Sequence, residues 1–245
     1  YADAHANMAR QFQIRERFEE AIHHYQEHNR FKPGVYEIWH NLGVTLVRVG
    51  KREQAVSAYR EAIRLNPEPG DTRMSLAQLL FELGRVKEAE KEILSQVQRS
   101  PQNAEVHYNL GVLYVQTDRF ENAMKSFRRA ADVDPENERA KSSAEQLVAD
   151  VNNRAWTLAT AADESQRNGK EAVKLAEMAA RWTNHENPGI LDTLAAAYAE
   201  TGQFEEAVKV AEEGLKLARE MEEDGLARLI QKHLELFKRD EAVRE

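Results

Sequence analysis

The chain lacks cysteine and has little glycine and proline, with 11 and 6 among its 245 residues. The absence of cysteine excludes disulfides, thiolate nucleophiles and cysteine-based zinc or iron–sulfur sites. No run approaches the roughly 18 consecutive apolar residues of a membrane-spanning helix, and no signal peptide opens the chain. The sequence therefore predicts no covalent cross-link and no direct membrane insertion.

The chain also has no excess of basic residues. It contains 34 lysine and arginine residues and 42 aspartate and glutamate residues, which gives a net charge of −8. Binding to nucleic acid regardless of sequence requires cations that neutralise phosphates, and docking on anionic lipid has the same requirement. We therefore expect no nucleic-acid partner. Because the first residue is Tyr1 rather than methionine, we expect the chain to be a fragment of a longer protein. Its charged composition predicts a soluble fragment, and the sequence does not indicate its cellular compartment.

The chain does have a period of 34 residues, at which prolines, alanines, small residues and large apolar residues recur. The four columns are Pro33, Pro67, Pro101 and Pro135; Ala21, Ala55, Ala89 and Ala123; Ala9, Gly43, Ala77 and Gly111; and Tyr25, Tyr59, Ile93 and Phe127. Self-similarity at this period predicts one helix-turn-helix unit per repeat, which proline closes. The small residues allow the first helix of each unit, helix A, to approach the second, helix B.

The order of these columns resembles the tetratricopeptide repeat (TPR). The second repeat matches most fully, through Trp39, Leu42, Gly43, Leu46, Ala55, Tyr59, Ala62 and Pro67. The resemblance implies an all-α fold, a right-handed superhelix (α-solenoid) of about six helix-turn-helix repeats. It also implies a concave groove that binds a peptide or protein segment. We predict four regular repeats at residues 1–136.

After Pro135 the register of the repeats breaks. Residues 152–160 look like helix A of a fifth repeat that comes late, so we expect one long helix over residues 137–161. A sixth repeat is marked by Ala195, Tyr198, Gly202 and Ala207. We predict two divergent repeats at 137–221, and a capping helix with a tail at 222–245, in one continuous solenoid. The apolar face of the capping helix should comprise Leu226, Leu229, Ile230 and Phe237. This closing part resembles the last two repeats of many bacterial TPR arrays. The resemblance implies that a membrane or enzymatic domain, a secretion component or further repeats lie upstream.

Residues of helix A that point away from helix B on a helical wheel are expected to line the groove. The predicted partner-binding residues are Asn7, Arg10, His40, Asn41, Val44, Met74, Ser75, Gln78, Phe81, Tyr108, Asn109 and Val112. Among them, Phe81 and Tyr108 are candidate anchors, because exposed apolar patches usually mark a partner site. The alternative is that adjacent A helices bury the apolar members on each other.

The set contains an incomplete row of asparagines at equivalent positions, which comprises Asn7, Asn41 and Asn109, with Ser75, Asn153 and Thr193 at the same place in other repeats. Asparagine costs roughly a few tenths of a kcal/mol relative to alanine inside a helix. Its amide both donates and accepts hydrogen bonds. The row resembles the asparagine ladder in the TPR superhelix of O-GlcNAc transferases, which implies that it binds a polypeptide backbone. The alternative is an asparagine that duplicated repeats tolerate in solvent.

The sequence offers little for catalysis, because it has no phosphate-binding glycine loop, nucleophile elbow or metalloprotease helix motif. His24 and His28 have a spacing that suits a metal, but no third ligand is placed and His28 lies in a core-packing column. We predict no metal, no cofactor and no enzymatic activity. The leading hypothesis is a non-catalytic protein-interaction scaffold. The alternatives are the substrate-recruiting arm of a larger enzyme, such as a glycosyltransferase, and a self-association module that forms an oligomer through its N-terminal repeat.

Overall fold

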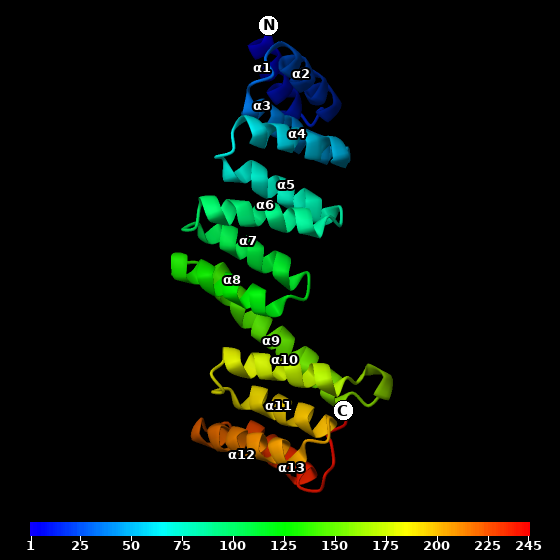
Figure 1. Cartoon of the computed structure of the whole chain (residues 1–245), viewed down its shortest axis with the longest axis vertical. Coiled ribbons are helices and arrows are strands. Elements are labelled where there is room, and N and C mark those ends of the chain that lie inside the picture. Colours follow the sequence, from blue (N-terminus) through cyan, green and yellow to red (C-terminus); the bar gives the residue numbers. More distant parts are fainter. The chain divides into compact units, whose positions relative to one another are not determined.

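The computed structural model describes residues 1–245 and is built from helices alone (Figure 1). They are α1 (Ala2–Ile14), α2 (Phe18–Phe31), α3 (Tyr36–Arg48), α4 (Arg52–Leu65), α5 (Gly70–Glu82), α6 (Val86–Arg99), α7 (Ala104–Val115), α8 (Phe120–Val133), α9 (Glu138–Thr160), the 3-10 helix η1 (Glu164–Gln166), α10 (Gly169–Trp182), α11 (Pro188–Glu200), α12 (Phe204–Glu220) and α13 (Asp224–Phe237). None combines the length and apolarity that crossing a lipid bilayer requires. The predicted all-α fold of helix-turn-helix repeats is confirmed.

The chain forms two compact units, in each of which helices pack on their neighbours in sequence. The first unit comprises Tyr1–Leu113 and Asp132–Asp134, and the second comprises Tyr114–Ala131 and Pro135–Glu245. In the first unit, each helix from α1 to α5 packs on the next one along the chain. In the second unit, the same holds from α9 to α12, and α11 also contacts α9 and α13. The division into 1–136, 137–221 and 222–245 stays a prediction.

Helix A and helix B of a regular repeat meet at the predicted small residues. The alanine column of helix B is fully buried, and the aromatic or aliphatic column beside it is buried as well. The approach is close at Gly43, where a Cβ atom would lie 2.6 Å from Cε1 of Tyr59. Because that distance is far inside van der Waals contact, only glycine leaves room for the Tyr59 ring between α3 and α4.

The ends of the helices follow the period as predicted. Each repeat-closing proline lies just beyond the end of a B helix, as Pro33 does after α2. Helix A ends at a residue with positive φ, which is 75° at Gly50 and 73° at Gly84. Glu16 and Asp118 take the same position in the first and fourth repeats, with φ of 59° and 55°. A side chain costs roughly 1–2 kcal/mol in this conformation, so the packing of the repeat imposes it even without glycine.

The second unit departs from the regular repeat where the sequence predicts it. Helix α9 spans 23 residues, and the side chain of its N-cap Asn137 accepts a hydrogen bond from the backbone N–H of Ala140. The following loop contains η1 and leads to α10, whose N-cap Asn168 is bonded in the same way to the N–H of Glu171. The long helix expected over residues 137–161 is therefore confirmed.

The capping helix α13 differs from its prediction at one residue. Ile230 and Phe237 are buried as expected, but Leu229 is 41% exposed, so its placement on the buried face was wrong. Leu229 precedes Ile230 by one residue, a rotation of about 100° that turns it to solvent. Its place on the buried face is taken by His233 and Leu234.

An imidazole pair joins the two helices of the first repeat. His5 of α1 and His24 of α2 face each other with their Nδ1 atoms 2.9 Å apart, so one ring donates its N–H to the other. His24 also stacks on Phe12, with ring centroids 5.3 Å apart. Burial lowers the pKa of His24, and the neighbouring His5 and His23 act in the same direction, whereas Glu27 opposes them. The folded chain therefore favours the neutral form of His24.

We expect the chain to lose stability as the pH falls through about 6.5, the ordinary histidine pKa. Between that value and the lowered pKa of folded His24, the unfolded state binds more protons, so the free energy of unfolding decreases with decreasing pH. Urea unfolding at several pH values measures this slope. His24→Gln should reduce the slope to the part that His40 contributes, whose pKa burial also lowers. His185→Asn, at an exposed residue with φ of 59°, should leave the slope unchanged. A full slope in the His24→Gln variant would contradict the assignment.

We expect Gly43→Ala to destabilise the chain, because its Cβ would collide with the Tyr59 ring. Overpacking of this kind costs about 1–3 kcal/mol, and the better helix propensity of alanine offsets at most about 1 kcal/mol. Gly225→Ala in α13 is the matched control, since its Cβ would meet nothing within 4 Å. Urea unfolding followed by circular dichroism compares the two variants, and equal stability of Gly43→Ala and the wild type would refute the packing argument.

Candidate functional site

The predicted partner-binding residues lie on the A helices of the first unit, α1, α3, α5 and α7. Asn7, Arg10 and Gln78 are exposed, the remaining members are half-buried, and none is buried. By contrast, the helix-B-facing residues Leu42 and Leu46 are buried. The predicted residues therefore belong to the surface of these helices, and we refer to the set as the asparagine face. That it binds a partner stays a prediction.

Three asparagines of this face have side-chain amides that make no hydrogen bond within the protein, namely Asn7, Asn41 and Asn109. The side chain of Thr45 bonds to Asn41 through the backbone carbonyl of Asn41, which accepts from Oγ1 at 2.7 Å, and not through its amide. Ser75 differs, because its hydroxyl donates to the carbonyl of Asp71 at 2.8 Å. Ser75 therefore interrupts the row both in sequence and in hydrogen bonding, and three amides remain available to a ligand.

The apolar members of the asparagine face are half-buried rather than fully exposed. They are Val44, Met74, Phe81, Tyr108 and Val112. The most exposed large apolar residues lie elsewhere, and they are Tyr1, Met8, Ile14, Phe31, Leu94, Met221 and Leu229. Four of these belong to the first repeat, where no pattern in the sequence marks the individual residues as exposed. The asparagine face is therefore mixed in polarity, whereas the open apolar surface concentrates on α1 and α2.

His40 links two A helices at the edge of the asparagine face. Its Nδ1 lies 2.9 Å from Oγ1 of Thr72, which joins α3 to α5. The ring also tilts against Tyr59 of α4, with centroids 5.8 Å apart. Burial lowers the pKa of His40, and nearby Asp71 opposes that shift. These contacts hold the imidazole in place, so His40 positions the helices that carry Asn41 and Ser75.

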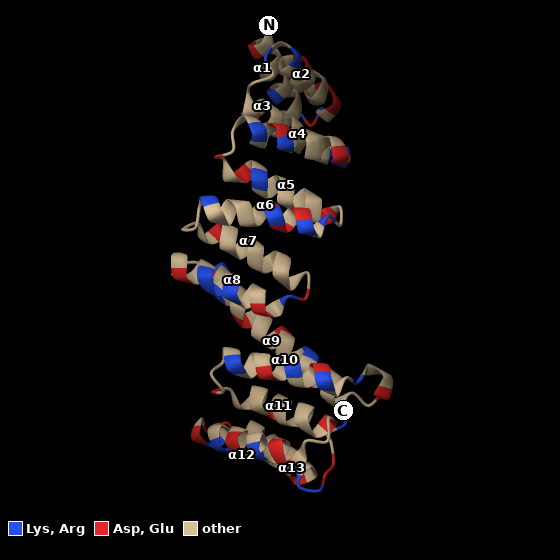
Figure 2. Cartoon of the chain, viewed as in Figure 1, with Lys and Arg blue, Asp and Glu red and all other residues tan.

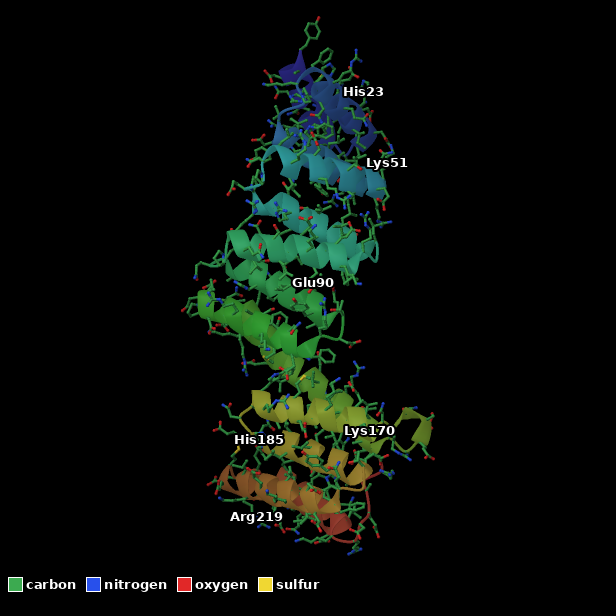
Figure 3. All side chains as sticks on the ribbon, in the orientation of Figure 1. His23, Lys51, Glu90, Lys170, His185 and Arg219 are labelled. Carbon is green, nitrogen blue, oxygen red and sulfur yellow. The ribbon has the colours of Figure 1, made fainter.

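The histidines of α2 do not form the i, i+4 pair whose spacing suits a metal. His28 is buried, with its Nδ1 3.2 Å from Oδ1 of Asn29, and His24 turns toward His5 instead. His23 is exposed on the surface of α2 (Figure 3). No group of three or more histidine, aspartate or glutamate residues is placed to hold a metal ion.

A depression of about 700 Å³ lies among α2, α3 and α4, and it contains no residue of the asparagine face. Trp39, Leu42 and Leu46 line it, together with the buried Asn29, whose Nδ2 has no hydrogen-bond partner. The sequence assigned Trp39 and the two leucines to packing columns. Such columns do not reveal whether one side of the packing is open to solvent, so the depression could not be predicted.

The position of Asn41 is buried in α11 of the second unit, whereas in α9 it holds Asn153, which is exposed. Thr193, the equivalent of Asn41, is 2% exposed, and its hydroxyl donates to the carbonyl of Gly189. Beside it, Nδ1 of His233 in α13 donates to the buried carboxylate of Asp192 at 2.9 Å. Figure 2 shows that α11 is nearly free of charge, with only Asp192 and Glu200. Because Thr193 is buried, it does not continue the asparagine row toward a partner.

Solved structures resemble this fold at low sequence identity. A TPR protein from Parabacteroides merdae is 18% identical, with a TM-score of 0.58 over 96% of this chain and 93% of that chain. The Cut9–Hcn1 structure of the APC/C is 14% identical, with a TM-score of 0.51 over 94% of this chain and 42% of that one. MamA from Desulfovibrio magneticus is 16% identical, with a TM-score of 0.49 over 89% of this chain and 96% of that chain. These likenesses concern the fold alone.

The sequence of the repeats itself matches a known family. No curated protein matches the chain. Three family models, each described as a tetratricopeptide repeat, match residues 40–104, 104–137 and 189–224, which together make up more than half of the chain. With the 34-residue columns at the helix A–helix B interface, these matches show that the chain belongs to the tetratricopeptide repeat family.

Proposed function

We propose that the first unit is a non-catalytic scaffold that binds an extended protein segment along the asparagine face. TPR modules typically mediate protein–protein interaction, as other repeat arrays do through their extended surfaces. The observation that carries the proposal is the recurrence of Asn7, Asn41 and Asn109 at equivalent positions, with no partner for their amides inside the protein.

The chemistry of these amides suits a polypeptide backbone. Each one donates through Nδ2 and accepts through Oδ1, which complements the N–H and C=O groups of an extended segment. Those backbone groups must find new partners when a segment leaves water. Because asparagine is a poor helix former, helix stability gives no reason for its presence inside α3 and α7. The row therefore supports recognition of a main chain, whatever its side chains.

The other residues of the asparagine face add selectivity. Met74 and Phe81 are partly open on α5 and offer apolar contact to alternate side chains of an extended segment. Arg10 is exposed on α1 and adds a cation. We therefore expect ligands with apolar side chains and at least one carboxylate.

We expect extended peptides selected from a library to lose affinity when asparagines are removed. The variant Asn41→Ala/Asn109→Ala deletes two amides, each worth about 0.5–1.5 kcal/mol when hydrogen-bonded. The dissociation constant should therefore rise about 5- to 100-fold, as fluorescence polarisation can measure. The matched variant Gln54→Ala/Gln98→Ala removes two exposed amides from the B helices α4 and α6 and should bind like the wild type. Equal binding by the asparagine variant and the wild type would sink the proposal.

Modified peptides separate backbone pairing from side-chain recognition in the same experiment. N-methylation of a peptide amide removes one backbone donor while the side chains stay unchanged. Methylation should weaken binding to the wild type, and its effect should be smaller in the asparagine variant, where the accepting amides are missing. Phe81→Ala tests the apolar contribution separately.

Self-association through the first repeat is a second candidate function. Met8, Ile14 and Phe31 are 40%, 74% and 53% exposed, and exposed apolar clusters commonly mark protein-binding surfaces. Their occupant would be the same repeat of another copy, in a self-complementary contact.

We expect the molar mass from light scattering to rise with protein concentration if this candidate holds. Met8→Glu/Ile14→Glu should abolish the rise, because two buried carboxylates would oppose the contact. The control Leu94→Glu/Leu229→Glu changes two exposed apolar residues outside the first repeat, 38% and 41% exposed, and should leave the rise intact. A constant monomer mass at all concentrations would contradict self-association and would have no bearing on the proposal of peptide binding.

A further inference from the structure

The end of the chain returns to α9 and α11 and lies there as an extended segment. Within this tail, which we define as residues 243–245, Val243 is only 4% exposed. The backbone N–H of Glu245 donates to the carbonyl of Thr160, and its carbonyl accepts from the N–H of Ala162, both at 2.9 Å. Both main-chain groups of one tail residue are thus paired with the segment that follows α9, as in peptide recognition by strand addition.

Charged contacts hold the other two side chains of the tail. A guanidinium nitrogen of Arg244 lies 2.7 Å from Oε2 of Glu200, whose side chain is 14% exposed. The contact is an ion pair without hydrogen-bond alignment, since Oε2 has no hydrogen-bond partner. Oε1 of the same carboxylate pairs with Nε of Arg167 at 3.0 Å. The indole Nε1 of Trp156 donates to the carboxylate of Glu245 at 3.2 Å. The tail therefore presents an apolar, a basic and an acidic residue to this surface, in that order.

The tail occupies the face of the second unit that corresponds to the asparagine face of the first. Trp156 in α9 takes the repeat position that Val44 holds in α3. Thr160 and Glu200 both take the position of Arg48, one turn further along helix A. Trp156 thus takes a position that we propose for partner binding in the first unit, whereas Thr160 and Glu200 lie one helical turn beyond the asparagine face.

We propose that Trp156, Thr160, Ala162 and Glu200 form a second peptide site, which recognises an extended segment with an apolar–basic–acidic sequence. The tail occupies this site in cis, and a partner segment with the same pattern takes its place. The site lies in the second unit, and its existence does not depend on peptide binding by the asparagine face.

The tail can leave its site without unfolding α13. Residues 238–241 of the connection between the two are exposed and bond to α13 through the carbonyls of Leu236 and Phe237, so the helix can keep these bonds when residues 243–245 leave. A short tether gives the tail an effective concentration in the millimolar range, so a competing segment needs contacts beyond the three tail residues. A depression of about 380 Å³ beside Glu245, lined in part by Thr157 and Gln166, provides room for them.

The test uses a chain that ends at Ala242 and a peptide with the sequence of residues 241–245. The indole N–H resonance of Trp156, assigned with Trp156→Phe, reports on the site by NMR. We expect the peptide to produce a saturable shift that restores the resonance toward its position in the full chain. Binding to the full chain should be at least about tenfold weaker, because the tail competes. A peptide with glutamate in place of arginine should not bind, and Glu200→Gln should weaken binding by about fivefold or more.

A full-length variant tests the same site without shortening the chain, so that misfolding of the shortened chain cannot be mistaken for a failure to bind. Val243→Asp/Arg244→Glu should release the tail and make the site available to the peptide, whereas Arg239→Glu, in the exposed connection, should not. Circular dichroism establishes that each variant is folded. A folded, tail-free chain with no saturable shift at Trp156 overturns the proposal. So does a full chain that binds the peptide as tightly as the shortened one.

Discussion

The close approach of helix A to helix B, at small residues such as Gly43 and Ala55, determines where every other side chain of a repeat points. Because the Tyr59 ring fills the space that a Cβ of Gly43 would need, α3 and α4 have a single way to pack. That packing buries one face of helix A and leaves Asn41 on the other. It also imposes the positive φ at the end of helix A, which Glu16 adopts even though glycine would suit it better.

Contacts within a repeat could be predicted from the sequence, because they recur at the 34-residue step. The buried alanine column, the prolines after each B helix and the positive φ at Gly50 all follow from that period. Contacts that occur once could not be predicted. The His5–His24 pair forms because two helices of one repeat bring these rings together, and no second repeat has histidines at both positions. The prediction that Leu229 is buried was wrong for a related reason, since α13 has no second copy in the chain with which its register could be compared.

For the candidate site, the helical wheel gives the direction of a side chain but not its surroundings. It places Asn41 and Asn109 on the surface, and the structure adds that their amides have no internal partner. The same reasoning placed Thr193 at the position of Asn41 in the sixth repeat, yet Thr193 is buried. Its helix, α11, packs on α9 and α13, which lie far from it along the chain. Long-range covering of this kind depends on tertiary contacts that a single repeat does not encode.

The contrast between α11 and α3 follows from the size of the side chains on these two A helices. In α11 the positions of Asn41 and Val44 hold Thr193 and Ala196, both small and buried, so another element can lie close against the helix. In α3 the larger Asn41 and Val44 are half-buried. A helix packed as closely there would have to cover the amide of Asn41, and it would offer a backbone whose hydrogen bonds are already made within the helix. An extended segment, whose N–H and C=O groups are free, satisfies that amide where a helix cannot. Small residues thus favour covering by a helix of the same chain, whereas unpaired amides favour an extended segment supplied by a partner.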